Sequence, residues 1–370
     1  MSAMESHPIA VDLFCGAGGL SLGLVDAGFV VAGAMDSWER AVSNYKLNFF
    51  HPVLCEDIQK ISGKEFLRQV GHDSEVHLVA GGPPCQGFSV QRIGEDADIR
   101  NSLVLEFGRF VSQIRPKMFL MENVPGLLGK RGKHVSVEFE TFVKSVGYEV
   151  RSLTVNAAEY GVPQVRKRIF YYGWLQSEGP TFIFPPPTHS PEQFESVIKA
   201  IGDLPSPTEE KTRDQKDALH RRTRLSPLNL ERLRYIPPGG GFESLPVRLR
   251  AKCHQNGAAG IGHRYVYGRL EHDRPAATIT ARFDSFTRGK FAHPFEDRNI
   301  TLREGARLQT FPDCFHFEGS QEEIAALIGN AVPPLLAGVL GRAFFSHLGG
   351  LSEDVMTAPR QESQFQLFRV

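Results

Sequence analysis

The stretch that most constrains the fold is residues 76–90, Val-His-Leu-Val-Ala-Gly-Gly-Pro-Pro-Cys-Gln-Gly-Phe-Ser-Val. Residues 76–80 are a short apolar run, typical of a strand that is buried on both faces. The glycines and prolines at 81–84 allow a sharp turn and then restrict the backbone, so Cys85 is held after the strand with little freedom. Catalytic groups often lie at this end of a parallel strand. A cysteine that only fills the core is the alternative, but it would need neither those prolines nor the Gln-Gly-Phe-Ser that follows.

Composition limits the class of protein. The chain has 370 residues, 41% hydrophobic and 23% charged, with zero formal net charge, which suits an enzyme with one large and one smaller domain. Any basic surface must therefore be local. The five cysteines form no Cys-x-x-Cys pair, so we expect neither a metal site nor a disulfide framework. No apolar run approaches a membrane span and the N-terminus lacks a signal-peptide pattern, so we expect a cytoplasmic protein that binds no membrane.

Two more predicted strands end in residues that suit a ligand. A strand over 9–14 runs into the glycine-rich turn Cys-Gly-Ala-Gly-Gly, whose glycines let a ligand approach the backbone. Asp36 closes the strand at 29–35 and Asp57 closes a short strand near 53, and such acids often accept hydrogen bonds from a ribose. Alternatively, each carboxylate is solvated or caps a helix. Because the turn is not Gly-x-Gly-x-x-Gly and no Gly-Lys-Ser/Thr follows, a nucleoside without phosphates fits best, and S-adenosylmethionine is the common one.

Glu122 and two arginines complete the candidate chemistry. Glu122 ends an apolar strand, so its carboxylate must pair with a cation or stay protonated, and beside the cysteine strand it is well sited for proton transfer. A carboxylate that only caps the turn is the alternative. For Arg166 and Arg168 we expect one to face a pocket and the other a phosphate or a carboxylate, unless both are solvated. Thr278 and Thr280 place two hydroxyls on one face of an extended segment.

The sequence pattern changes at residue 177. Residues 177–262 are rich in proline, glycine and charge and show little periodicity, so we separate them from a catalytic part at 1–176 that 263–348 completes. Residues 349–370 form a polar tail. Basic side chains concentrate in the irregular part, either as a solvated surface or as a face that contacts phosphates. They are Lys211, Arg213, Lys216, Arg221, Arg222, Arg224, Arg232, Arg234, Arg248, Arg250 and Lys252.

Six motifs, taken in order, resemble those of the cytosine-C5 DNA methyltransferases. They are Asp-Leu-Phe-Cys-Gly-Ala-Gly-Gly (12–19), Gly-Gly-Pro-Pro-Cys-Gln-Gly-Phe-Ser (81–89), Glu-Asn-Val (122–124), Gln-Val-Arg-Lys-Arg (164–168), Arg-Leu-Gln-Thr-Phe-Pro (307–312) and Gly-Asn-Ala-Val-Pro-Pro (329–334). The resemblance runs from about residue 9 to 348. It implies an α/β, Rossmann-like S-adenosylmethionine-dependent methyltransferase domain with a mostly parallel sheet, plus a small irregular target-recognition domain at 177–262 that faces it across a DNA cleft.

The resemblance also implies a role for individual residues. Cys85 corresponds to the nucleophile, Glu122 to the acid at the cytosine ring nitrogen, and Arg168, supported by Arg166, to the group on the exocyclic oxygen. For the cofactor, the resemblance implies that Phe14 packs on the adenine and that Gly16 and Gly18 lie under the methionine part. Asp36 would hold the ribose hydroxyls and Asp57 the adenine amino group. The other implied cofactor-binding residues are Gly19, Leu20, Ile58, Pro83, Asn330 and Val332. The implied substrate-binding residues are Gln86, Ser89, Asn123, Gln164, Thr278 and Thr280. Family members often have an aromatic residue directly after the acid at 36, whereas here Ser37 follows and Trp38 comes next.

The activity implied by the resemblance is methyl transfer to cytosine C5 in double-stranded DNA, by a monomer, in a restriction-modification system with a cognate endonuclease. C5 is too electron-poor to attack a sulfonium, so a thiolate must first add to C6 of a base flipped out of the duplex. One alternative is a tRNA cytosine-5 methyltransferase, although the Cys-Phe-Thr stretch typical of that branch is missing. Others are a thiol hydrolase using Cys85 and a histidine, and a DNA-binding regulator without activity, against which intact Cys85, Glu122 and Arg168 argue.

Overall fold

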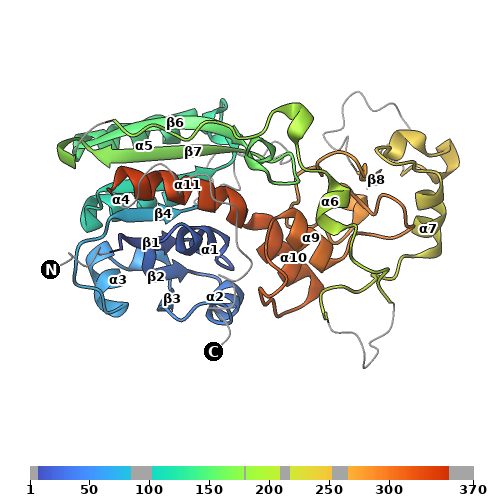
Figure 1. Cartoon of the computed structure of the whole chain (residues 1–370), viewed down its shortest axis with the longest axis horizontal. Helices are drawn as coiled ribbons and strands as arrows, with labels where there is room; N and C mark the ends of the chain where they lie inside the picture. The colour runs from blue at the N-terminus through green and yellow to red at the C-terminus, as the bar shows by residue number, and fades with distance from the viewer. Residues whose placement is uncertain (1–6, 85–101, 179–180, 209–216, 252–265, 350–370) are drawn as a thin grey trace. The chain divides into compact units, whose positions relative to one another are not determined.

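The computed structural model describes the chain except for residues 1–6, 85–101, 179–180, 209–216, 252–265 and 350–370 (Figure 1). The chain divides into two compact units. The first unit comprises Met1–Asn156, Lys167–Thr188 and Ala331–Val370, and the second comprises Ala157–Arg166 and His189–Asn330. These units are defined by packing. The functional boundaries expected at residues 177, 262 and 348 therefore stay a prediction.

A seven-stranded sheet forms the centre of the first unit (Figure 1). Its strands lie in the order β3-β2-β1-β4-β5-β7-β6, parallel from β3 to β5, while β7 runs antiparallel to both β5 and β6. The strands are β1 Ile9–Leu13, β2 Val30–Asp36, β3 Val53–Cys55, β4 Leu78–Gly81, β5 Met118–Asn123, β6 Tyr148–Asn156 and β7 Lys167–Leu175. The mostly parallel sheet confirms the predicted α/β, Rossmann-like fold.

Six longer helices accompany this sheet within the described part of the first unit. They are α1 Gly19–Asp26, α2 Glu39–Lys46, α3 Gly63–Gln69, α4 Ser102–Ile114, α5 Lys133–Ser145 and α11 Pro334–His347. A Cβ built on Gly23 would lie 2.4 Å from the Cβ of Ala337, so only glycine lets α1 and α11 approach this closely. Arg342 donates to the Asp26 carboxylate at 3.1 Å across the same contact. The last helix is thereby fixed to the helix that follows the first strand (Figure 1).

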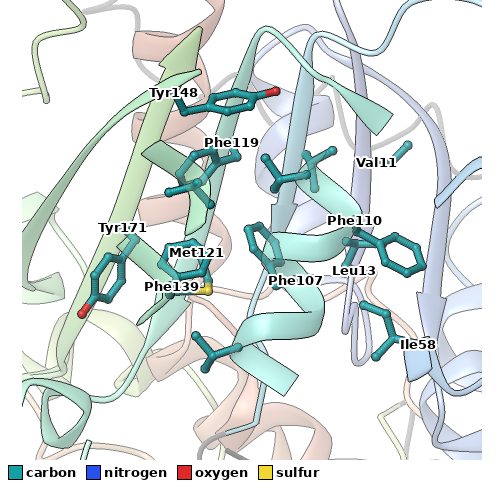
Figure 2. Close-up of a cluster of buried hydrophobic side chains, with 14 of the residues drawn as sticks. Val11, Leu13, Ile58, Phe107, Phe110, Phe119, Met121, Phe139, Tyr148 and Tyr171 are labelled. Carbon is teal, nitrogen blue, oxygen red and sulfur yellow. The ribbon is translucent and has the colours of Figure 1, made fainter. Parts of the chain in front are cut away.

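Aromatic side chains fill the core between the sheet and helices α4 and α5 (Figure 2). Phe107 and Phe110 of α4 and Phe139 of α5 are fully buried. The rings of Phe139 and Phe119, on β5, meet edge to face with their centroids 5.9 Å apart. Burying each ring stabilises the fold by about 1.5–3 kcal/mol. This core holds the parallel strands in register, so the positions of their carboxyl ends are fixed.

The second unit contains short elements and much irregular backbone. Its described helices and strands include α6 Val197–Ile201, α7 Pro227–Arg234, α9 Leu302–Leu308, α10 Gln321–Asn330, β8 Gly268–Arg269 and β9 Lys290–Ala292. Irregular backbone leaves carbonyl groups that need a donor when they are buried. Arg269 is 4% exposed and supplies donors to the carbonyl oxygens of Ile236 at 2.7 Å and His293 at 2.8 Å. Buried arginines thus replace part of the hydrogen bonding that a sheet would supply.

The stretch Gln321–His347 is the most apolar long segment of the described chain that is helical. By length and composition Gln321–His347 could cross a membrane, so the prediction that no run approaches a membrane span is wrong for the part of the chain described. Within the structure, however, 72% of its most apolar window is buried, and residues 331–333 separate α10 from α11. This burial is typical of core helices. The described residues contain no group of three His, Cys, Asp or Glu side chains that could hold a metal ion.

Candidate active site

The glycine-rich turn after β1 has a left-handed backbone at three positions. Phe14 has φ +59°, Gly16 +55° and Gly18 +99°, and the Gly18 N–H donates to the Cys15 carbonyl at 2.9 Å before α1 begins. A Cβ on Gly18 would lie 2.3 Å from the ring of Phe49, so this glycine is required by packing. A Cβ on Gly16 would meet nothing within 4 Å. The turn therefore leaves open space above Gly16, where a ligand could contact the backbone.

Asp36, at the end of β2, is tied to this turn. Its Oδ2 accepts a hydrogen bond from the Gly16 N–H at 2.9 Å, and its Oδ1 accepts one from the Trp38 N–H at 2.8 Å. Burial raises the pKa of the Asp36 carboxyl, and these backbone hydrogen bonds oppose that rise. Each carboxylate oxygen can accept a second hydrogen bond. Asp36 can therefore hold the turn and still accept from the hydroxyls of a ligand.

The other residues of the first unit that were predicted to bind a cofactor have structural roles of different kinds. Asp57 caps a short 3-10 helix, because its Oδ1 accepts from the Gln59 N–H at 3.0 Å. One oxygen of the Asp57 carboxylate is therefore used to cap the helix, as the helix-cap alternative predicted. Ile58 and Leu20 are buried, at 3% and 5% exposure, and contribute packing. Gly19 opens α1 directly after the turn.

A buried hydrogen-bond chain lies beneath the turn, and the sequence analysis missed it. Ser21 Oγ donates to Asp12 Oδ2 at 2.6 Å, and Tyr45 Oη donates to Ser21 Oγ at 2.6 Å. Since the one hydroxyl proton of Tyr45 is thus used, Tyr45 Oη accepts from His51 Nε2 at 2.5 Å. Asp12 is fully buried, and burial raises its pKa to about 7. Burial likewise lowers the pKa of His51 to about 4. The available signal was an acid in the middle of the apolar strand Ile-Ala-Val-Asp-Leu.

The ends of β1, β4 and β5 meet at one edge of the sheet. The Gly82 N–H donates to the Leu13 carbonyl at 3.3 Å, which brings the loop after β4 beside the glycine-rich turn. Asn123 Nδ2 donates to the Pro83 carbonyl at 3.1 Å, which fixes the first residues of that loop to β5. A Cβ on Gly82 would lie 3.6 Å from Glu122 Oε2. The loop that leads to the predicted nucleophile therefore begins beside the predicted acid.

Cys85, Gln86 and Ser89 lie outside the described residues, so their predicted roles stay predictions.

Glu122 is paired with a cation, which is one of the two alternatives that the sequence left. Arg168 Nε lies 2.9 Å from Glu122 Oε1, and the two side chains are 17% and 12% exposed. The Arg168 N–H bond is not directed at Oε1, which has no hydrogen-bond donor among the described residues. The contact is therefore ionic, and the oxygen keeps its capacity to exchange a proton or a hydrogen bond with a substrate. The expectation that one of the two arginines faces a carboxylate is met by Arg168.

Arg166 and Gln164 lie in the second unit and are 1% and 0% exposed. Arg166 Nη1 donates to the carbonyl oxygens of Ile279 at 3.1 Å and Gly329 at 3.0 Å. Gln164 donates to Gln309 Oε1 at 2.8 Å and accepts from the Ile279 N–H at 2.7 Å. Both side chains hold segments of the second unit together. In this structure Arg166 and Gln164 would therefore affect a substrate by positioning those segments, not by direct contact.

The remaining predicted residues are distributed over both units. Thr278 Oγ1 donates to the Val165 carbonyl at 2.8 Å, and Thr280 packs against Gly329, where a Cβ would come within 2.2 Å of the Thr280 backbone. Asn330 ends α10 in the second unit and is exposed, whereas Val332 is buried at 7% exposure in the first. Among the predicted residues of the first unit, the structure therefore brings Gly16 to Asp36 at the glycine-rich turn, Pro83 to Asn123, and Glu122 to Arg168. Within the described part of the chain, it shows no such contact for Asp57 or Val332.

Residues 10–346 match the family model of C-5 cytosine-specific DNA methylases. The chain is 34% identical over 347 residues to the Type II methylase M.HgiDII of Herpetosiphon aurantiacus, covering 93% of this chain and 96% of that protein. It is 35% identical over 339 residues to the Type II methyltransferase M1.HphI of Haemophilus parahaemolyticus, covering 90% and 85%.

Solved structures show the same fold. A prophage-encoded E. coli protein assigned as a DNA modification methyltransferase superposes with a TM-score of 0.72 at 25% identity, over 92% of this chain and 99% of that one. The S. pombe Dnmt2 methyltransferase superposes with a TM-score of 0.56 at 18% identity, over 91% and 98%.

Proposed function

The chain belongs to the C-5 cytosine-specific DNA methylase family and is a DNA (cytosine-5-)-methyltransferase, and on that basis we propose that it methylates a cytosine in a specific duplex site through a transient bond to Cys85. The observation that carries the proposal is the Glu122–Arg168 pair, which lies beside Gly82 at the start of the cysteine loop. Family membership argues against the thiol hydrolase. The relatives named as a methylase and a methyltransferase argue against an inactive regulator.

S-adenosylmethionine is the methyl donor of this family, and the residues of the glycine-rich turn fit it. The open space above Gly16 and the hydrogen-bonding capacity left on Asp36 support a nucleoside ligand there. We propose that Phe14 contacts the adenine, that Asp36 accepts from the ribose hydroxyls, and that Asp57 contacts the adenine amino group. The bound donor supplies an electrophilic methyl group on a sulfonium.

The chain's own groups prepare the cytosine. Glu122, which is ion-paired in this structure, must first take up a proton from solvent. The Cys85 thiolate then forms a bond to C6, and the electron pair displaced into the ring is taken up as Glu122 gives that proton to N3. C5 thereby becomes an enamine carbon that can accept the methyl group. Loss of the C5 proton to a base, expulsion of the thiolate from C6 and return of the N3 proton to the Glu122 carboxylate then restore the neutral aromatic ring. General-acid assistance of this kind accelerates a reaction by about 10²–10⁴-fold.

Arg168 supports the proton transfer from its position beside Glu122. Once Glu122 has given up its proton, the carboxylate lies 2.9 Å from the Arg168 guanidinium, which stabilises the negative charge. We further propose that Arg168 contacts the exocyclic oxygen of the base. Arg166 has a positioning role, since it donates to two main-chain carbonyls.

The biological setting is also part of the proposal. A base stacked in a duplex shields C6, so the target cytosine must be flipped out at a cost of a few kcal/mol. The Type II names of the relatives support a role in restriction and modification, with a cognate endonuclease. We further propose that the enzyme is a monomer in the cytoplasm.

Covalent trapping tests the proposal. An oligonucleotide duplex that contains 5-fluorocytosine at the target, incubated with enzyme and donor, should yield a protein–DNA band on a denaturing gel, because fluorine at C5 cannot leave as a proton. The target site is first mapped by bisulfite sequencing of DNA from a methylation-free host. Cys85→Ser should give no band while still binding DNA. A wild-type enzyme that forms no adduct, or that transfers methyl groups only to tRNA, would overturn the assignment.

A further inference from the structure

The basic side chains of the second unit are not equivalent. Arg222, Arg232 and Arg250 donate to main-chain carbonyl oxygens at 3.3, 2.8 and 2.8 Å. Arg248 pairs with the carboxylate of Glu231 at 2.8 Å. These are four of the seven basic side chains of this set that the structure describes, and each has a protein partner inside the unit.

Arg221, Arg224 and Arg234 differ, because within the described residues they form no ion pair or side-chain hydrogen bond. Arg224 and Arg234 are exposed to solvent, which satisfies their donors. Arg221 is half-buried, and its Nε atom is buried without an acceptor. The Nε atom is closed off from solvent, so it is not the group that a ligand would reach. Arg221 is nevertheless the half-buried arginine of this set, so an acceptor in a neighbouring cavity would stabilise its guanidinium most.

Arg221 lines a cavity of about 310 Å³ that lies entirely within the second unit. Arg222 and Thr223 line the same cavity, next to Arg221 in the chain. Apolar side chains, among them Leu219 and Phe317, form another part of the lining. The cavity therefore offers guanidinium and hydroxyl groups to a compact ligand that carries acceptor oxygens.

Two carboxylates in the lining restrict the charge of that ligand. Asp284 is 8% exposed and is paired with Arg282 at 3.2 Å, while Glu318 is exposed. Like-charge repulsion from these groups disfavours a doubly charged free phosphate ion more than a singly charged phosphodiester. A phosphodiester also has the two unbonded oxygens that an arginine fork binds well.

We propose that this cavity binds one backbone phosphate of the DNA substrate, with Arg221 as its principal ligand and Arg222 and Thr223 beside it. The proposal rests on the proposed DNA methyltransferase function and adds a contact remote in sequence from Cys85 and Glu122. Such a contact fixes the position of the duplex without reading its sequence.

The salt dependence of DNA binding tests this contact. Anisotropy titrations with the mapped target duplex at several salt concentrations should show that Arg221→Gln weakens binding roughly tenfold and lowers the slope of log K against log salt by about 0.9, the value for one phosphate. Arg221→Lys keeps the charge and should keep most of the slope. Lys199→Gln is the matched control, because it removes one positive charge that is already paired with Glu195 at 3.1 Å, and it should leave the slope unchanged.

Further readouts separate the outcomes. Arg221→Gln should keep the thermal stability and the donor affinity of the wild type, and inorganic phosphate should not raise the melting temperature of either protein. An unchanged slope of log K against log salt in folded Arg221→Gln would overturn the inference. If inorganic phosphate also raised the melting temperature of the wild type alone, the cavity would be a site for free phosphate and not for DNA. If the wild type fails to methylate DNA at all, the proposed function fails; if it methylates DNA and the slope is unchanged, only the cavity assignment fails.

Discussion

Two glycines in the same turn should respond differently to the same substitution. Gly16→Ala adds a methyl group where no atom lies within 4 Å, whereas Gly18→Ala adds one that would lie 2.3 Å from the Phe49 ring. Both residues have positive φ, +55° and +99°. We therefore expect the first substitution to affect the ligand and the second to affect the fold.

The magnitudes follow from these contacts. A left-handed backbone costs an alanine about 1–2 kcal/mol, which the lower entropy of its unfolded chain offsets by about 0.4–1 kcal/mol. Gly16→Ala should thus lower the free energy of unfolding by about 1 kcal/mol or less. Gly18→Ala adds overpacking against Phe49, about 1–3 kcal/mol more, for a total of about 2–4 kcal/mol. For a domain of this size those losses lower the melting temperature by roughly 2–4 °C and 5–15 °C respectively.

Calorimetry measures both effects. Thermal scans give the stability of each variant, and isothermal titration with S-adenosylmethionine gives its affinity at a temperature where both variants are folded. Gly16→Ala should lose at least about tenfold in affinity, since 1.4 kcal/mol of lost contact or steric conflict suffices for that. Gly18→Ala should show the larger thermal loss. Wild-type affinity in Gly16→Ala would show that the space above this glycine holds only solvent, and a harmless Gly18→Ala would refute the packing argument.

Three other predictions concern single buried or half-buried groups. Glu122→Gln should slow methyl transfer by about 10²–10⁴-fold in a radiolabelled-methyl assay with little change in donor affinity; a matching loss of donor affinity would instead mean that Glu122 is structural. Asp12 has its pKa raised to about 7 by burial, so the native state holds a proton that the unfolded state releases, and stability falls as pH rises towards 7. Urea unfolding should show about 3 kcal/mol of this loss between pH 5 and pH 8, and Asp12→Asn should remove it; an unaltered pH profile in that variant would contradict the assigned pKa. Glu304→Gln should destabilise the protein by about 3–5 kcal/mol in the same assay, because it removes the carboxylate that pairs with Arg298 where both side chains are 1% exposed. A loss below about 1 kcal/mol would mean that Glu296, the other carboxylate paired with Arg298, compensates.

Local sequence accounts for the elements and turns of the first unit. The apolar runs that end in Leu13, Asp36 and Gly81 do form parallel strands, and Gly18 and Gly16 do occupy left-handed positions. These features depend on neighbouring residues, because backbone sterics and short apolar periods act over a few positions. Parallel strands then align their carboxyl ends, so the clustering of the candidate residues could be predicted as well.

The strand order could not be predicted in the same way. Arg168 reaches Glu122 because β7 inserts antiparallel between β5 and β6, so that Glu122 faces Phe170 across the ladder. Pairing between strands that are distant in the chain depends on the packing of the whole sheet. The residue pattern alone did not say which of Arg166 and Arg168 would face a carboxylate. The structure buries Arg166 on carbonyl groups and pairs Arg168 with the Glu122 carboxylate.

For this protein, then, the sequence by itself determined the order of the strand-and-turn units, the ligand-binding type of their end residues and the family to which they belong. Only the tertiary structure decided which polar groups are satisfied by protein partners, as in the chain from His51 to Asp12, and which, like Arg221, are left with a donor unused. The physical reason is that the free energy of a polar side chain depends on its burial and on partners supplied by remote segments, and neither is encoded at the position of the residue itself.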